Sequence, residues 1–177
     1  MATDDFTRRQ WLLGVGGLGM GIATAAAEEA PRFGAVSTEP FPRDAYEALL
    51  RLKNGNRRFM ADKPSHAHEK ASWRSLLVEE QKPFATILGC SDSRVPPELI
   101  FDVGFGDLFT IRLAGNIIAE DVLGSLQYAA AHLHTSLIVV LGHEGCGAVT
   151  ATLEEMLNTP KESGHIESLI KMIGSPE

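Results

Sequence analysis

The sequence predicts an α/β protein with a parallel-centred β-sheet flanked by helices. Residues 108–112 and 137–141 are candidate strands, and residues 84–89 form a continuous apolar segment. A strand that is covered on both faces has this composition, because neither of its faces needs polar side chains. Residues 120–134, between the two candidate strands, carry apolar side chains at helical spacing. Strand, helix and strand in this order predict a right-handed crossover within a parallel sheet.

Length and composition are those of one globular domain. The chain has 177 residues, of which 44% are hydrophobic, and a formal net charge of −7. An acidic balance argues against nucleic acid as a partner, because nucleic-acid binding requires a basic surface. No uninterrupted apolar run of about 18 residues follows the N-terminal region, so we expect no membrane span in the mature protein.

Residues 1–27 are interpreted as a twin-arginine signal peptide. Arg8 and Arg9 precede a weakly hydrophobic, glycine-rich stretch that ends in three alanines before Glu28. Charge, apolar run and cleavage site stand in the order that export requires, which predicts a periplasmic or secreted protein. The alternatives are a disordered glycine-rich tail and an uncleaved anchor, for which the glycines are poorly suited.

The remaining chain is divided into a linker and a domain. Residues 28–42 contain three prolines and read as a linker or N-terminal arm, and residues 43–177 form the expected domain. We expect helices at 43–61, 73–80, 145–156 and 166–173. The polar residues 62–82, with His66 and His68, are expected to wrap the surface, with both histidines in solvent.

The only two cysteines of the chain lie in compact motifs that follow predicted strands. Cys90 comes directly after the first strand, and His143 and Cys146 come after the third. Two thiolates and an imidazole form a zinc ligand set, and three protein ligands leave one position open, as in catalytic zinc sites. Parallel strands bring their carboxyl ends to one edge of a sheet. A disulfide is the alternative in an exported protein.

A carboxylate and a guanidinium follow the first cysteine at alternate positions, Asp92 and Arg94. In an extended loop their side chains and that of Cys90 project the same way. Arg can hold a carboxylate in a bidentate fork, and Asp92 held in this way can accept a hydrogen bond from hydroxide on zinc. Released by Arg94, Asp92 could itself bind zinc and close the site. The alternative is a surface salt bridge of little energetic value.

These motifs together resemble the β-class carbonic anhydrases. The segments that carry the resemblance are residues 90–96, 106–116 and 142–149, with Gly-Asn-Arg-Arg-Phe at 55–59. The resemblance covers roughly residues 43–157. It implies a parallel-centred α/β sheet, a homodimer or higher homo-oligomer, and one Zn²⁺ per chain.

Carried onto this sequence, the resemblance implies zinc on Cys90, His143 and Cys146, with Asp92 as a conditional fourth ligand and Asp92 and Arg94 as the catalytic dyad. The implied reaction is the reversible hydration of CO2 to bicarbonate and a proton by zinc-bound hydroxide. We expect its rate to rise with pH from neutral to alkaline.

Two other functions stay open at this point. Hydrolysis of COS or CS2 would use the same ligands behind a different access channel. A non-catalytic zinc-binding fragment is the third interpretation, because members of this family usually continue well beyond the point at which this chain ends, Glu177. We therefore expect that a C-terminal part is missing.

Overall fold

The computed structural model of the chain describes residues 40–157 and 162–174. The predicted signal peptide, residues 1–27, lies outside the described residues, as does the predicted linker up to residue 39. Among the helices of the described ranges, none combines the length and the apolar character that crossing a membrane demands.

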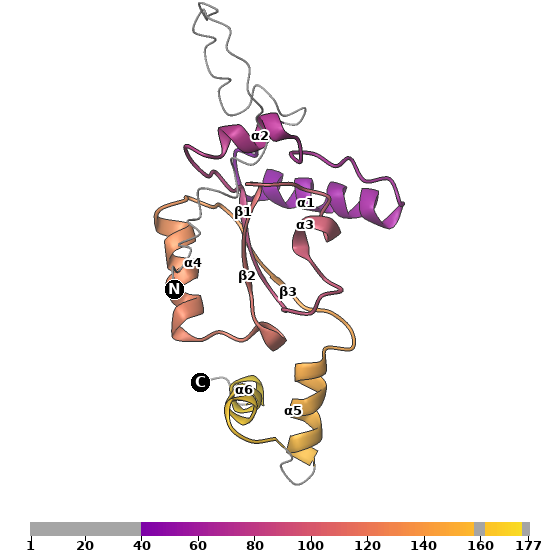
Figure 1. The fold of residues 1–177 in the computed structure, drawn as a ribbon, viewed down its shortest axis with the longest axis vertical. Coiled ribbons are helices and arrows are strands. Elements are labelled where there is room, and N and C mark those ends of the chain that lie inside the picture. The colour runs from indigo at the N-terminus through magenta and orange to yellow at the C-terminus, as the bar shows by residue number, and fades with distance from the viewer. Residues whose placement is uncertain (1–39, 158–161, 175–177) are drawn as a thin grey trace, which may run out of the picture. The chain divides into compact units, whose positions relative to one another are not determined.

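A three-stranded parallel sheet forms the centre of the described chain (Figure 1). Its strands are β1 (Ala85–Gly89), β2 (Leu108–Arg112) and β3 (Ile138–Leu141), in the order β2-β1-β3. Gly89 of β1 lies level with the last residue of each neighbouring strand. All three strands therefore end together at one edge of the sheet. The predicted α/β class is confirmed.

Two helices cover opposite faces of the sheet. Alternate residues of β1 point to opposite faces. Ile87 packs in one cluster with Leu52 of α1 (Ala45–Met60), whereas Leu88 packs in a second cluster with α4 (Glu120–Ala131). Figure 1 shows α1 and α4 on the two sides of the strands. Every residue of β1 is buried, which is why its sequence is apolar without alternation.

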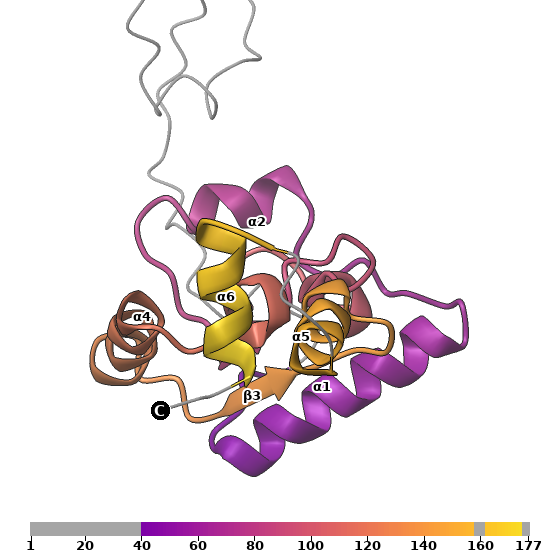
Figure 2. The same ribbon diagram turned by 90° about the horizontal axis from the view of Figure 1, so that it is seen from below.

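The remaining elements are shorter or lie later in the chain. In Figures 1 and 2, α5 and α6 lie side by side, and they contact each other. The sequence predicted α2, α5 and α6 to within a few residues, but α3 and η2 are single turns that leave no periodic pattern. Their bounds are α2 Ala71–Leu76, α3 Pro97–Ile100, η2 Ala114–Asn116, α5 Gly147–Leu157 and α6 His165–Gly174.

Gly55 in the middle of α1 marks a close approach between chain segments. Glycine lowers intrinsic helix stability, so its presence there needs a reason. A Cβ atom at Gly55 would lie 1.6 Å from the carbonyl oxygen of Phe101. The glycine thus lets α1 pack directly against the main chain that follows α3.

One stretch of the sheet is not covered by described residues. Ile138 and Val140 of β3 are 48% and 64% exposed, and they lie on the same face as Thr86 and Leu88 of the neighbouring strand. A parallel sheet is ordinarily covered on both faces. This part of β3 therefore offers an apolar surface for further contacts.

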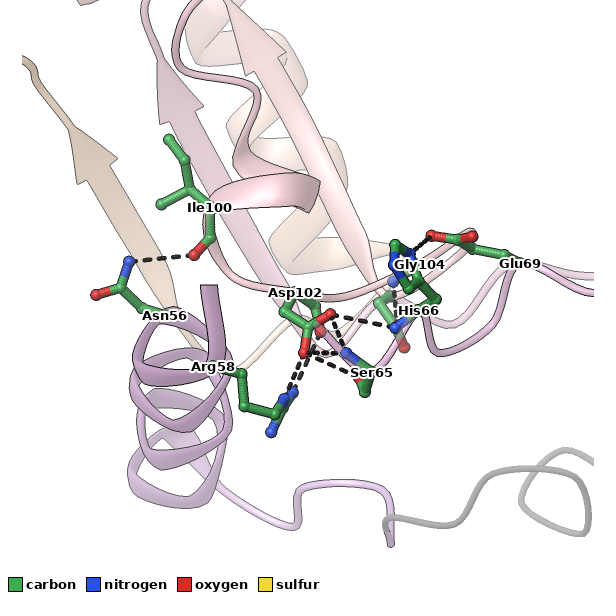
Figure 3. Close-up of polar contacts among 9 residues, drawn as sticks. Asn56, Arg58, Ser65, His66, Glu69, Ile100, Asp102 and Gly104 are labelled. Carbon is green, nitrogen blue, oxygen red and sulfur yellow. Dashed lines mark hydrogen bonds and ion pairs between the residues drawn. The ribbon is translucent and has the colours of Figure 1, made fainter. Parts of the chain in front are cut away.

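Asp102 joins three segments of the chain on the side of α1 (Figure 3). Its buried carboxylate is paired with Arg58 of α1 and accepts hydrogen bonds of 2.9 Å from the main-chain N–H and the hydroxyl of Ser65. Nearby, the side-chain amide of Asn56 donates to the carbonyl of Ile100 at 3.1 Å. These contacts fix the end of α1 and the loop that follows it against the segment after α3.

Replacing Asp102 with Asn is expected to weaken the fold and to flatten its response to acid. Burial opposes ionisation, but hydrogen bonds from Arg58 and Ser65 outweigh it and hold the pKa of Asp102 below its ordinary value. Stability from a lowered pKa is present above the unfolded pKa and is lost as pH falls through the folded one. We expect a loss of about 1–3 kcal/mol at neutral pH, and a smaller slope of unfolding free energy against pH below about pH 4. Urea unfolding at several pH values measures both.

Asn suits this position because φ at Asp102 is 44°, in the left-handed region. A variant with the same acid slope as the unaltered chain would show that other carboxyl groups cause the acid response.

The structure corrects the prediction that His68 is solvated. Only 6% of its side chain is exposed, and Nδ1 lies 2.7 Å from Oδ2 of Asp107. Its ring stacks on Trp73 with 3.8 Å between centroids. Asp107 also meets Arg51 at 3.2 Å, so the imidazole belongs to a buried polar cluster. His66 stays exposed, as expected.

Candidate metal centre

The three predicted zinc ligands lie together at the carboxyl edge of the sheet. Cys90 follows β1, and His143 and Cys146 follow β3. Their ligand atoms all lie within 4.8 Å of one another. The two Sγ atoms are 3.9 Å apart, close to the edge of about 3.8 Å that Zn–S bonds of about 2.3 Å give in a tetrahedron. That distance is far longer than an S–S bond of about 2.05 Å, and both thiols are free.

His143 is oriented as a metal ligand usually is. Its Nδ1–H donates to the carbonyl of Glu144 at 3.0 Å, which leaves Nε2 with a lone pair. Nε2 is buried and has no hydrogen-bond partner among the described residues. Buried polar atoms are seldom left without a partner. A metal ion between Nε2 and the two sulfur atoms would supply one, so the residues present fit zinc.

The surroundings of Cys90 favour its thiolate. Burial disfavours the charge, but the main-chain N–H groups of Gly115 and Asp92, with His143 and Cys146 close by, outweigh it and lower the pKa of Cys90 to about 7. The thiolate is the form that binds metal. Gly115 has φ of 70°, and a Cβ atom there would lie 2.6 Å from Cδ1 of Ile173. The positive φ therefore favours glycine at this position, whereas the end of the Ile173 side chain could shift to admit a Cβ atom.

Asp92 and Arg94 form a bidentate ion pair beside the three ligands. Oδ1 of Asp92 accepts from the main-chain N–H and Nε of Arg94, both at 2.9 Å, and Oδ2 accepts from Nη2 at 2.7 Å. Arg94 holds the pKa of Asp92 well below its usual range. Oδ2 also lies 4.0 Å from Nε2 of His143. The carboxylate thus lies beside the imidazole of one of the three candidate ligands.

The main chain around this pair differs from the extended loop that the sequence suggested. The carbonyl of Asp92 accepts from the N–H of Val95 at 3.2 Å, so the chain turns after Asp92. The ion pair forms within this turn, because a short Asp side chain readily caps the N–H two residues on. Nη2 of Arg94 also donates to the carbonyl of Gly145 at 3.1 Å, which links the two motif loops.

Arg112 and Asn116 contribute to this edge of the sheet, although no role was predicted for them. Arg112 donates to the carbonyls of Cys90 and Asp92, and Asn116 donates to the carbonyl of Leu141 at 2.6 Å. Both belong to residues 106–116, which carried part of the family resemblance. The available signal was a charged residue at the end of a strand that leads to the predicted site.

These observations define an α/β protein with a Cys2His group that could hold a metal ion at the carboxyl edge of a parallel sheet. Comparison with known proteins identifies its family. A family model described as "Carbonic anhydrase" matches residues 85–176. "Carbonic anhydrase 2" of Mycobacterium tuberculosis is 45% identical over 122 residues, and a carbonic anhydrase of Mycolicibacterium smegmatis is 44% identical over the same length.

Solved structures agree. The β-carbonic anhydrase of Coccomyxa in complex with acetazolamide has a TM-score of 0.53 and 31% identity, and covers 70% of this chain and 54% of its own. One of two tetrameric β-carbonic anhydrases from Sordaria macrospora has a TM-score of 0.50 and 26% identity, over 71% and 60%. The chain belongs to the β-class carbonic anhydrase family. The matches cover 69% of this chain and 59% of the two mycobacterial relatives.

Proposed function

We propose that this chain is a zinc-dependent carbonic anhydrase that interconverts CO2 and bicarbonate with release or uptake of a proton. The observation that carries the proposal is the convergence of Cys90, His143 and Cys146 beside the pair of Asp92 and Arg94. Zinc in such a site acts as a Lewis acid and makes water a nucleophile near neutral pH. The named relatives support the same reaction.

In this proposal Asp92 orients the attacking nucleophile. Because Arg94 keeps its carboxylate ionised, Asp92 can accept a hydrogen bond but cannot donate one. It therefore selects a nucleophile that still carries a proton, and turns the lone pair of that nucleophile toward CO2. Arg94 has a second effect, since two hydrogen bonds restrain Asp92 from moving the short distance to the open metal position.

We further propose that the protein is a homo-oligomer that is exported before it acts. The exposed apolar side chains of β3 and the tetrameric relative of known structure support the first part. The order of charge, apolar run and alanines in residues 1–27 supports the second.

The test is stopped-flow CO2 hydration by the zinc-loaded full chain, with zinc content and oligomer mass measured on the same sample. We expect one zinc per chain and a rate that rises from about pH 6 to about pH 9. Cys146→Ser should lower both zinc affinity and hydration by about 100-fold or more, since it removes a ligand. A chain that binds one zinc without hydrating CO2 faster than buffer would exclude the anhydrase and leave hydrolysis of COS or CS2 and non-catalytic zinc binding as the interpretations.

A further inference from the structure

The guanidinium of Arg112 holds the loop that carries both Cys90 and Asp92. Arg112 is the last residue of β2, level with Gly89 at the end of β1. Its Nε donates to the carbonyl of Cys90 at 2.8 Å, and its Nη2 donates to the carbonyl of Asp92 at 2.6 Å. One side chain therefore fixes the main chain at a predicted metal ligand and at a predicted catalytic residue.

The geometry of this contact depends on the backbone of residues 90–92. The N–H of Ser91 donates to the carbonyl of Leu113 at 3.1 Å, and so continues the ladder between β1 and β2. The carbonyls of Cys90 and Asp92 both face this guanidinium, since each accepts a hydrogen bond from it. The planar fork of an arginine can reach both of them at once, whereas a lysine ammonium is a single point charge on a flexible stem.

Residues 90–92 also carry the side chains of Cys90 and Asp92, which must meet residues that follow β3. His143 and Cys146 follow β3, on the far side of β1 from Arg112. Small shifts of residues 90–92 would therefore change the distance between ligands that belong to different strands. Such a shift would also loosen the turn in which Arg94 holds Asp92.

We propose that Arg112 is a positioning residue, which locks residues 90–92 so that the Cys90 thiolate lies in register with the other two ligands and Asp92 stays out of the metal position. The inference rests on the proposed function for its catalytic consequence. Its effect on metal binding follows from the contacts alone. Arg112 acts through the main chain and need not touch substrate.

The experiment compares Arg112→Gln and Arg112→Lys with the unaltered full chain. The control is Arg74→Gln, which removes another guanidinium that donates to a main-chain carbonyl, that of Glu69 at 2.7 Å, in a helix away from the site. The measurements are zinc affinity by competition with a chromophoric chelator, the absorption spectrum of the Co²⁺-loaded protein across pH, and thermal unfolding of the metal-free protein.

We expect Arg112→Gln to weaken zinc affinity by about 10–100-fold, the usual effect of removing a group that orients a ligand. Its Co²⁺ spectrum should lose the pH response of the unaltered chain, because the freed Asp92 occupies the open position. The zinc affinity of Arg112→Lys should fall between those of Arg112→Gln and the unaltered chain. Arg74→Gln should match the unaltered chain in zinc affinity and in its Co²⁺ spectrum.

The inference is overturned if Arg112→Gln lowers the unfolding temperature but keeps zinc affinity within about twofold, with an unchanged Co²⁺ spectrum, since Arg112 would then only stabilise the fold. If Gln at this position prevents folding, the Lys variant decides by the same two measurements. An unaltered chain that binds metal but hydrates no CO2 would end the proposed function, while the affinities would still decide the role of Arg112.

Discussion

Replacing Asp92 with Ala is expected to lower kcat/KM for CO2 hydration by about 100-fold or more while one zinc per chain is retained. The substitution removes the carboxylate oxygen that Arg94 holds in place. It leaves the three proposed zinc ligands, Cys90, His143 and Cys146, unchanged. Stopped-flow kinetics and zinc analysis on the same preparation measure the two quantities. Asp92→Asn should fail similarly, because an amide can donate where the reaction needs an acceptor.

The control for this variant is Glu167→Ala, which breaks an exposed ion pair with Lys171 on α6. Exposed pairs contribute little, so kcat/KM should stay within about twofold. If Asp92→Ala behaved like this control, the pair of Asp92 and Arg94 would be an ordinary surface salt bridge and the proposed dyad would be wrong.

The second large effect concerns stability. Asp107→Ala is expected to lower the free energy of unfolding by about 3–5 kcal/mol, because it removes one partner of a buried charge pair and leaves the other in the interior. The side chains of Arg51 and His68 around it are only 9% and 6% exposed. Oδ2 of Asp107 also accepts a hydrogen bond from the main-chain N–H of Gly104 at 2.8 Å.

Urea unfolding of the metal-free protein measures this loss without a contribution from zinc binding. The control is Asp121→Ala, an exposed carboxylate in the first turn of α4, for which we expect a loss within about 1 kcal/mol. If Asp107→Ala lowered the free energy of unfolding by as little as Asp121→Ala, the cluster of Asp107, Arg51 and His68 would contribute little to stability.

The sheet and its main helices could be predicted because their signals are local. Residues 84–89 are apolar without alternation, and β1 is buried at every position. Residues 120–134 carry a helical stripe, and α4 ends three residues earlier than that range. Single turns such as α3 and η2 have too few residues for a period. The strand order β2-β1-β3 was also not predicted, since local patterns do not say which strand is central.

The burial of His68 could not be read from its neighbours in sequence. Residues 62–82 are polar in composition, and the acidic partner of His68 lies 39 positions away. For the site, the ligand types and their places after two strands predicted that the three side chains meet. The roles of Asp92 and Arg94 stay predictions. Arg112 was missed because its partners are main-chain carbonyls, which no pattern of residue types reveals.

The central place of β1 has a consequence for the order in which the molecule assembles. Cys90 and Cys146 are 56 residues apart in the chain, and the second of them is positioned only when β3, the last strand of the described sheet, has joined its neighbour. Pairing between strands far apart in the chain is slow, because the entropy cost of closing the long loop between them precedes any gain from their contacts. Pairing of β2 with β1 positions the thiol of Cys90 and the side chain of Arg112. It does not yet bring a second metal ligand beside Cys90. High affinity for metal thus emerges when β3 pairs with β1, and metal capture reports that the three described strands have assembled.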